Sequence, residues 1–434
     1  MKSLVMIFSV FLISIFNLTE SFSHQLGVTV NHSQATTFSK SEYPFPIQNS
    51  EIATMASQIP VTRTKDFKEI RLTRFEERNQ TYLFEKNYKL ILNYIAQEEA
   101  SEAPLYFILP GVGGVGGGPV VDGLMQQLHD NGNHVVSLAN PLSWQFVIGA
   151  STNITTGFLP WDIKDSHELM KLVVTELKAR GLKISSYNLI GFSLGGALLP
   201  SLVRYDDEQG YFKFKKAILM NPPLDIILGV DKLDTFYSVG KDWSLEYRDS
   251  VMGYIYGFGN KVLNSKKPLP ELVKEFNLTT VQKQFIIGSV YRDSLTEMIF
   301  TIAALEPSPL LKTPVSRSER SARMQEARSF SYRQYLEDVL LVKVNSLEKK
   351  ESFSNLEQLL KGYDLYNYKD LFAKDNRFYI FHNEDDFLLS HKDFHFIETT
   401  FKERAFLFPF GGHCGNFSFP INKALLKSVT LNNN

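Results

Sequence analysis

The sequence of 434 residues predicts an α/β fold in which a mostly parallel sheet is covered by helices on both faces. Short apolar stretches alternate with longer segments of helical spacing, and this alternation is typical of a parallel sheet. The alternation stops near residue 225 and resumes near residue 376. We therefore expect about 150 residues to be inserted between two strands of one domain.

The composition is ordinary for a globular protein with a sizeable core, with 44% hydrophobic and 21% charged residues. The formal net charge of −1 offers no electrostatic attraction for nucleic acid, so no nucleic-acid partner is expected. The single cysteine, Cys414, cannot form an intramolecular disulfide, so the core alone must hold the fold together.

The N-terminal residues 1–23 are predicted to be a signal peptide. Lys2 precedes the apolar stretch Leu4–Phe16, which is too short for a comfortable membrane span, and Ser21-Phe-Ser23 offers a cleavage site. We expect cleavage near Ser23 and export, either to a periplasm or out of the cell. An uncleaved N-terminal anchor is the alternative. Residues 24–60 are rich in Ser, Thr, Asn and Gln without periodicity, and are predicted to form a poorly ordered extension.

The predicted core consists of residues 61–224 and 376–434, separated by a helical insertion over residues 225–375. In the first part, strands are expected at Tyr82–Phe84, Tyr88–Tyr94, Leu105–Leu109, Val135–Leu138, Tyr187–Ile190 and Ala217–Met220, and helices at Val120–Asp130, Asp162–Arg180 and Gly195–Arg204. The clearest helices of the insertion are Ser294–Leu305, Arg320–Val344 and Leu356–Tyr363. The second part holds strands at Arg377–Phe381 and Ala405–Phe408 and a helix at Lys423–Val429.

A glycine-rich loop follows the strand Leu105–Leu109. Its glycines at 111, 113 and 116 have the spacing G-x-G-x-x-G of a dinucleotide-binding loop. Such a site also needs an acidic residue at the end of the next strand, to bind the ribose. That strand is followed by Ala139-Asn140-Pro141, which contains no carboxylate. A dinucleotide is therefore not expected here.

The segment Gly191-Phe-Ser193-Leu-Gly195 has the pattern G-x-S-x-G between a predicted strand and a predicted helix. This context is typical of a nucleophile elbow, whose sharp turn lifts the serine hydroxyl above the sheet edge and close to a helix N-terminus. Ser193 is therefore the predicted nucleophile. A tight turn with a buried serine is the alternative.

A nucleophilic serine needs a base and an acid. Of nine histidines, His413 is preferred because it follows the last strand on a loop with glycines on both sides. A loop histidine bonded only to backbone is the alternative. The acid is expected in the turn after Arg377–Phe381, where Asp386 is preferred to Asp385, and Asp385 to Glu384. The unused neighbour Asp385 is expected to be solvated.

These motifs resemble those of the α/β-hydrolase superfamily over residues 82–224 and 376–430. The resemblance rests on Leu109-Pro-Gly-Val-Gly113, Gly191–Gly195, Asn383-Glu-Asp-Asp386 and Gly411-Gly-His413. It implies an α/β-hydrolase fold with a mostly parallel eight-stranded sheet and a large helical cap inserted after the sixth strand. It also implies an oxyanion hole formed by the backbone N–H groups of Val112 and Leu194. Many relatives carry His-Gly where this chain has Pro110-Gly111.

The expected function is that of a serine hydrolase that cleaves carboxylic esters through an acyl-enzyme, with Asp386 orienting His413. A peptidase or amidase with the same triad is one alternative, and a catalytically silent binding protein is another, although such a protein needs no triad. The expected partner is a small-molecule or lipid ester, with the cap as a candidate for lipid or membrane-surface contact, and the oligomeric state is left open. No cofactor or metal is expected, because His391-x-Asp-x-His395 matches no strong metal motif.

Overall fold

The computed structural model describes residues 34–59, 61, 63–72, 74–75, 77–78, 90–97, 102–265, 267, 271–272, 275–306, 310–349 and 352–431. The predicted signal peptide 1–23 and the predicted strand Tyr82–Phe84 lie outside the described residues. None of the helices described combines the length and the apolar character that crossing a membrane requires.

The described strands form one sheet of nine, in the order β1-β9-β8-β7-β6-β4-β5-β3-β2. Their bounds are β1 Thr36–Thr37, β2 Lys68–Leu72, β3 Leu90–Ile95, β4 Ala103–Leu109, β5 His134–Ser137, β6 Ile184–Phe192, β7 Ala217–Met220, β8 Phe378–Asn383 and β9 Ala405–Phe408. Neighbouring strands are parallel except where β3 pairs with β2 and with β5. From β2 to β9 this is the strand order of the α/β-hydrolase fold. The predicted count of eight was one short, because β1 adds a ninth strand beside β9.

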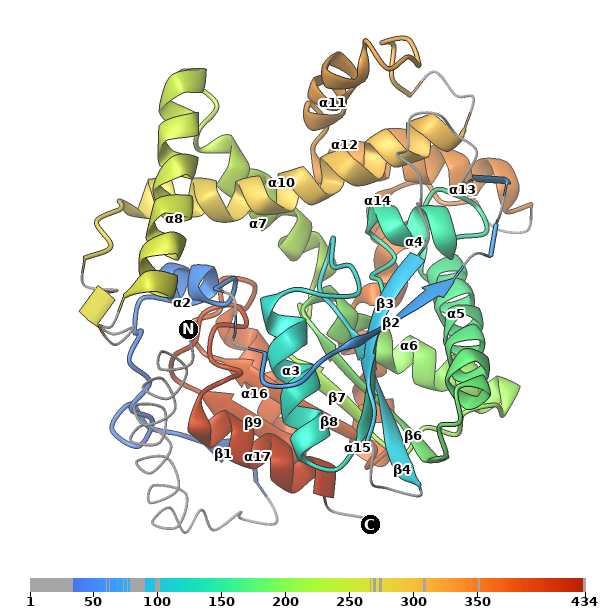
Figure 1. Cartoon of the computed structure of the whole chain (residues 1–434), viewed down its shortest axis with the longest axis vertical. Helices are drawn as coiled ribbons and strands as arrows, with labels where there is room; N and C mark the ends of the chain where they lie inside the picture. Colours follow the sequence, from blue (N-terminus) through green and yellow to red (C-terminus); the bar gives the residue numbers. More distant parts are fainter. Residues whose placement is uncertain are drawn as a thin grey trace, which may run out of the picture.

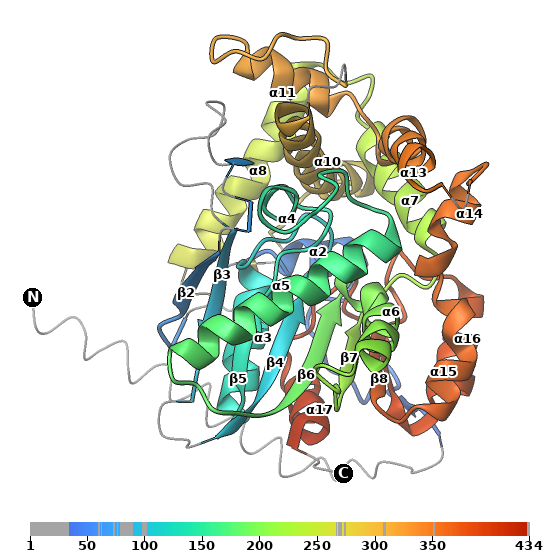
Figure 2. The same ribbon diagram turned by 90° about the vertical axis from the view of Figure 1, so that its right-hand side faces the viewer.

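Helices cover both faces of the sheet (Figures 1 and 2). Helices α3 (Pro119–Asp130) and α17 (Pro420–Leu431) lie on one face, and α5 (Leu159–Ala179), α6 (Leu194–Gln209), α15 (Lys369–Lys374) and α16 (His391–Phe401) on the other. Side chains of β4 alternate between the two layers, since successive residues of a strand point to opposite faces. Leu105 and Phe107 join the core under α5 and α6, whereas Tyr106 and Ile108 join the core under α3 and α17.

The predicted insertion is helical through most of its described length and forms a cap over one end of the sheet (Figure 1). Its elements are α7 (Ile226–Ser238), α8 (Leu245–Asn264), α10 (Thr280–Leu305), α11 (Arg320–Arg328), α12 (Tyr332–Gln334), the π-helical turn Tyr335–Leu341, α13 (Val342–Leu347), α14 (Leu356–Leu360) and the 3₁₀ turns Lys361–Tyr363 and Leu365–Tyr368. Two further short elements lie outside the insertion, the helix α4 (Trp144–Gly149) and the 3₁₀ turn Lys402–Arg404.

The end of this insertion belongs to the core. Helix α15 places Phe372 against Phe378 of β8 and against Phe401 of α16. A crossover between the parallel strands β7 and β8 needs a helix that covers the sheet, and α15 is that helix. The cap therefore ends before the predicted boundary at residue 375.

Residues 34–59 are packed against the core, and the prediction of a poorly ordered extension is wrong for them. Tyr43, Phe45 and Ile47 are buried, and the Tyr43 ring contacts Phe408 and Phe419. Helix α2 (Ser50–Ala56) follows, with the Asn49 side chain accepting a hydrogen bond from its first turn. Figure 1 shows α2 between the sheet and the cap helix α8.

Candidate active site

Ser193 lies at the turn between β6 and α6, as the pattern predicted. Its backbone has φ 52° and ψ −131°, which is a strained conformation for a residue with a side chain. The Ser193 N–H donates to the carbonyl of Met220 at 2.9 Å, which holds the turn against β7. At position 195, an added Cβ would lie 2.1 Å from the carbonyl oxygen of Leu109, so only glycine fits. The turn is thus fixed by its neighbours on both sides.

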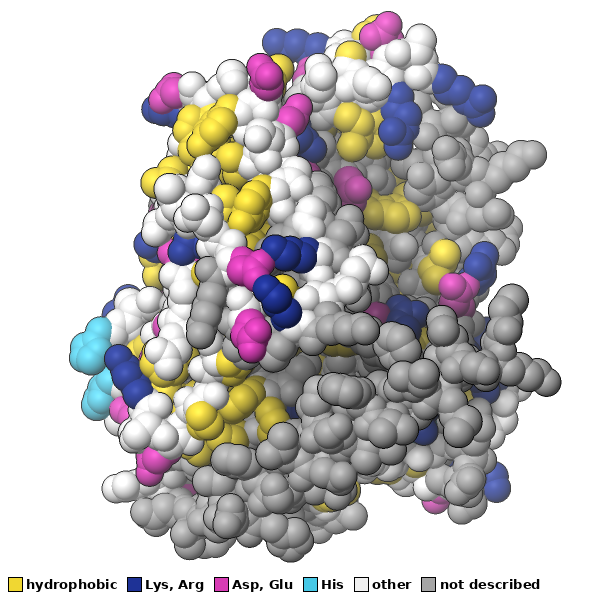
Figure 3. Space-filling model, turned by 60° about the vertical axis from the view of Figure 1, so that its left-hand side comes forward, with side chains coloured by type: hydrophobic (Ala, Val, Ile, Leu, Met, Phe, Trp, Pro, Cys, Tyr) yellow, Lys and Arg dark blue, Asp and Glu magenta, His cyan; other side chains and the backbone are white. Residues whose placement is uncertain are grey.

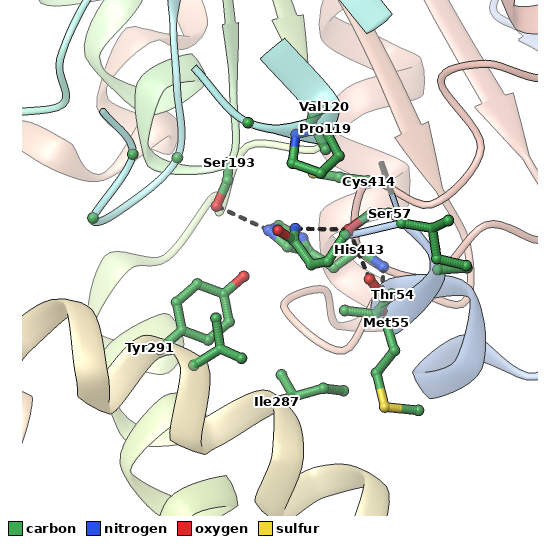
Figure 4. Close-up of a pocket in the computed structure, with 18 of the residues that line it drawn as sticks. Thr54, Met55, Ser57, Pro119, Val120, Ser193, Ile287, Tyr291, His413 and Cys414 are labelled. Atoms are coloured by element: carbon green, nitrogen blue, oxygen red, sulfur yellow. Dashed lines mark hydrogen bonds between the residues drawn. The ribbon is translucent and has the colours of Figure 1, made fainter. Parts of the chain in front are cut away.

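The structure brings Ser193, His413 and Asp386 together in one hydrogen-bonded chain. The Nε2 atom of His413 lies 2.8 Å from Ser193 Oγ, a contact drawn in Figure 4. Its Nδ1 atom lies 2.9 Å from Asp386 Oδ2. All three residues are buried, with 7%, 3% and 3% of their surface exposed for Ser193, His413 and Asp386. This is the arrangement that a serine nucleophile, its base and an orienting acid require.

Of the three candidate acids, only Asp386 contacts the imidazole. Its carboxylate also accepts hydrogen bonds from the Asn221 side chain and the Leu388 N–H. Asp385 is not solvated as predicted, because it is partly buried and accepts from the N–H groups of Gly411 and Gly412. Glu384 is exposed. Asp386 therefore orients the ring, while Asp385 supports the loop that carries it.

The pair His413–Asp386 is coupled electrostatically. Burial, the largest single effect, lowers the pKa of His413, but the charge and hydrogen bond of Asp386, together with the nearby Cys414 and Tyr291, outweigh it and raise that pKa above its usual range. Burial alone would raise the pKa of Asp386, and the charge and hydrogen bond of His413 lower it below its usual range. The carboxylate thus stays ionised and stabilises a proton on the ring.

The glycine-rich loop lies directly beside Ser193. A Cβ added at Gly111 would lie 3.0 Å from the Cβ of Ser193. The Asn140 side chain, from the end of β5, donates to the carbonyl of Pro110 at 2.8 Å and braces the loop. Within the described part of the chain, the N–H groups of Val112 and Leu194 donate to no protein acceptor. Both predicted oxyanion-hole donors are thus unpaired on the loop and turn that meet at Ser193.

Helix α2 is a part of the site that the sequence reasoning missed. The side-chain oxygen of Thr54 accepts from the backbone N–H of His413 at 2.8 Å. A Cβ at Gly412 would lie 2.1 Å from the carbonyl oxygen of Ser50, so the histidine loop and α2 are in close contact. The available signals were the N-capping Asn49 and the alternating Tyr43, Phe45 and Ile47, and both are short and weak.

A cavity of about 490 Å³ opens above Ser193 and His413. Its walls come from α2 and the turn after it, from the glycine loop and the start of α3, and from the cap helices α8 and α10 (Figure 4). Most lining side chains are apolar, including Ile52, Met55, Met252, Ile255, Ile286, Ile287 and Val290. Among the described lining residues there is no Asp, Glu, Lys or Arg. The cavity therefore suits an uncharged, apolar ligand.

Tyr291 on α10 also lines this cavity, and sequence reasoning missed it. The helical spacing of its segment is that of an ordinary core helix, so no local signal marks it.

The three residues of His391-x-Asp-x-His395 do not converge, because Asp393 is buried and accepts from the backbone of the N-cap Ser390, while both histidines are exposed. No cluster of three or more metal-ligating side chains occurs in the part of the chain that is described.

Comparisons with solved structures give distant similarities. An esterase from Pseudomonas putida is 12% identical, with 88% of this chain and 86% of that chain covered and a TM-score of 0.38. A hyperthermophilic esterase from the archaeon Pyrobaculum calidifontis is 12% identical, with 88% of both chains covered and a TM-score of 0.38. A soluble variant of monoglyceride lipase from Saccharomyces cerevisiae, in complex with a substrate analog, is 12% identical, with 86% and 97% covered and a TM-score of 0.41.

No protein-family model matches the sequence, and no curated protein is significantly similar to it. The class of fold is nevertheless defined by the chain itself. The strand order from β2 to β9, the elbow at Ser193 and the helical cap between β7 and β8 make this an α/β-hydrolase fold.

Proposed function

We propose that this protein is a serine hydrolase that cleaves carboxylic esters through an acyl-enzyme. One observation carries the proposal: Ser193 Oγ, His413 and Asp386 form an unbroken hydrogen-bonded chain at the floor of an apolar cavity. A binding module would need neither the strained elbow nor the buried acid–imidazole pair, both of which cost stability.

In the first half of the reaction, His413 Nε2 takes the proton of Ser193 while Oγ attacks the ester carbonyl carbon. The N–H groups of Val112 and Leu194 hold the negative oxygen of the tetrahedral intermediate. Asp386 keeps Nδ1 protonated and stabilises the imidazolium. The C–O bond to the alcohol then breaks, the imidazolium gives its proton to the departing oxygen, and the acyl group remains on Ser193.

In the second half, His413 takes a proton from water, which attacks the acyl carbon and passes through a second tetrahedral intermediate. Collapse of this intermediate returns the proton to Ser193 Oγ and releases the carboxylic acid. The same groups thus act in both halves, so one triad accounts for the full cycle.

The cavity supports esters with an apolar acyl group as substrates. A charged substrate would lose its hydration here without meeting an opposite charge on any described lining residue. Lipid contact through the cap is part of the proposal. Leu245, Tyr247 and Tyr254 of α8 are exposed, and hydrophobic side chains lie in several groups among charged ones on the side of the molecule that carries α8 (Figure 3).

Labelling with a fluorophosphonate probe tests the proposal. The wild-type protein should be labelled on Ser193, and Ser193→Ala should not be labelled while its far-UV circular dichroism stays the same. A series of p-nitrophenyl esters of increasing chain length, with the matching p-nitroanilides, then separates esterase from amidase activity. Labelling that persists in Ser193→Ala would exclude this serine as the nucleophile, and faster anilide than ester cleavage would favour the amidase alternative.

A further inference from the structure

Tyr291 places a phenol hydroxyl over the triad from the cap. Figure 4 shows its hydroxyl pointing toward Ser193 and His413 from the opposite side of the cavity. Within the described residues this hydroxyl has no hydrogen-bond partner, although the backbone carbonyl of Tyr291 accepts from the Tyr332 hydroxyl at 2.9 Å. Burial raises the pKa of the Tyr291 phenol and the positive charge of His413 lowers it, so the two groups lie within electrostatic reach.

The helix that carries Tyr291 is held firmly, so the hydroxyl is prearranged. Arg292, the next residue, pairs with Asp234 of α7 at 3.0 Å. One turn later, Ser294 packs against the glycine loop, where a Cβ at Gly113 would meet it at 2.3 Å. Two turns earlier, Lys283 donates to the Asn49 side chain next to α2 at 2.9 Å. Contacts to α7, to the loop and to α2 thus fix α10 along its length.

Packing alone does not explain why a tyrosine occupies this position. Phenylalanine would fill the same space beside Ile287 without exposing a hydroxyl to an apolar cavity, where an unpaired polar group costs free energy. In the proposed reaction His413 Nε2 gives a proton to the departing oxygen, so that oxygen must lie close to Nε2. A hydrogen-bond donor that faces Ser193 and His413 from the cap therefore faces this oxygen as well.

We propose that Tyr291 is a catalytic residue whose hydroxyl donates a hydrogen bond to the leaving-group oxygen of the ester. This inference rests on the proposed ester hydrolysis. The hydroxyl keeps its proton throughout, and the proton that the departing alkoxide acquires comes from His413. The hydrogen bond strengthens as negative charge grows on the oxygen, so it favours the transition state over the bound substrate. Esters of alkyl alcohols depend on this help most, since their alkoxides are poor leaving groups.

The test compares two esters of the same acid, one with an alkyl alcohol and one with p-nitrophenol, in the wild type, Tyr291→Phe and the control Tyr335→Phe. We expect Tyr291→Phe to lower kcat/KM for the alkyl ester by about 10- to 100-fold, as for a lost hydrogen bond to a charged group. The value for the p-nitrophenyl ester should change little, because p-nitrophenolate needs no such stabilisation. Tyr335→Phe removes a buried hydroxyl that donates to the Thr156 carbonyl outside the cavity, and it should change kcat/KM for both esters by the same factor.

Thermal unfolding provides a second readout. Because the Tyr291 hydroxyl is unpaired, Tyr291→Phe should unfold at the wild-type temperature or above it, and a clear decrease would overturn the assignment. Equal losses for both esters, or no loss for either, would also overturn it. If the wild type neither reacts with a fluorophosphonate nor cleaves either ester, the proposed function itself fails. The two failures are therefore distinguishable.

Discussion

The Thr54 side chain and the His413 backbone N–H form a hydrogen bond of 2.8 Å between residues that are 359 positions apart in the chain. Thr54 lies on α2, before the hydrolase core begins, whereas His413 follows the last strand. The Thr54 hydroxyl also donates to the carbonyl of Ser50, which fixes its orientation. The N-terminal segment is thus built into the support of the proposed catalytic base.

Thr54→Val should lower kcat by about 10- to 100-fold with little change in KM, because a small displacement of the base slows the chemistry more than binding. Thr54→Ser keeps the hydroxyl and should retain most of the wild-type rate. The measurement is kcat and KM on one activated ester, with thermal unfolding in parallel. An equal loss in both variants would mean that Thr54 acts through its methyl group and not through this hydrogen bond.

Substitution of the two neighbouring aspartates should separate their roles. Asp386→Asn should lose up to about 10⁴-fold in kcat with normal folding, because the imidazole would be held in the wrong tautomer. Asp385→Asn should keep most of its rate but unfold at a lower temperature, since Asp385 accepts two backbone N–H groups of the histidine loop. His413→Ala is the reference for a lost base. If Asp385→Asn were the inactive variant, the assignment of the acid would be wrong.

Stability should fall with rising pH because of Asp162, which is buried under the cap. Its carboxyl group accepts from the Gly157 N–H and the Tyr363 hydroxyl, both at 2.9 Å, and burial raises its pKa to about 8. Between its unfolded pKa near 4 and this value, the folded state holds a proton that the unfolded state has released. Raising the pH through this window therefore favours unfolding, by up to about 1.4 kcal/mol per pH unit.

Asp162→Asn removes this titration and keeps a side-chain acceptor. Thermal unfolding of both proteins between about pH 5 and pH 8 should show a growing advantage of the variant as the pH rises. Groups common to both proteins cancel in the difference. Parallel curves would show that Asp162 is ionised in the folded state throughout.

We propose that the protein is exported and that its mature form begins near His24. This rests on the basic start, the apolar stretch and the Ser-x-Ser site within residues 1–23. Intact-mass measurement of the protein recovered from the exported fraction should therefore lack Met1–Ser23. A mass that includes these residues would favour an uncleaved anchor.

Local patterns in the sequence were sufficient for the alternation of strands and helices, for the elbow at Ser193 and for placing His413 after the last strand. Each of these depends on residues a few positions apart, such as the pairing of Gly191 and Gly195 around the serine. The preference for Asp386 over Asp385 came from the spacing that the resemblance to α/β-hydrolases implies, and the structure places the Asp386 carboxylate on the imidazole.

The sequence by itself thus determined the α/β core, since backbone periodicity and turn chemistry are local, and it predicted the helical insertion and the members of the proposed triad. Only the tertiary structure decided that residues 34–59 are ordered, that Thr54 supports His413 and that Tyr291 faces the triad. Tyr43, Phe45 and Ile47 look like scattered apolar residues in a polar segment until β9 and α17 provide a surface to bury them. The free energy gained by burying these side chains comes from contacts with residues hundreds of positions away, and no local window of sequence contains both partners.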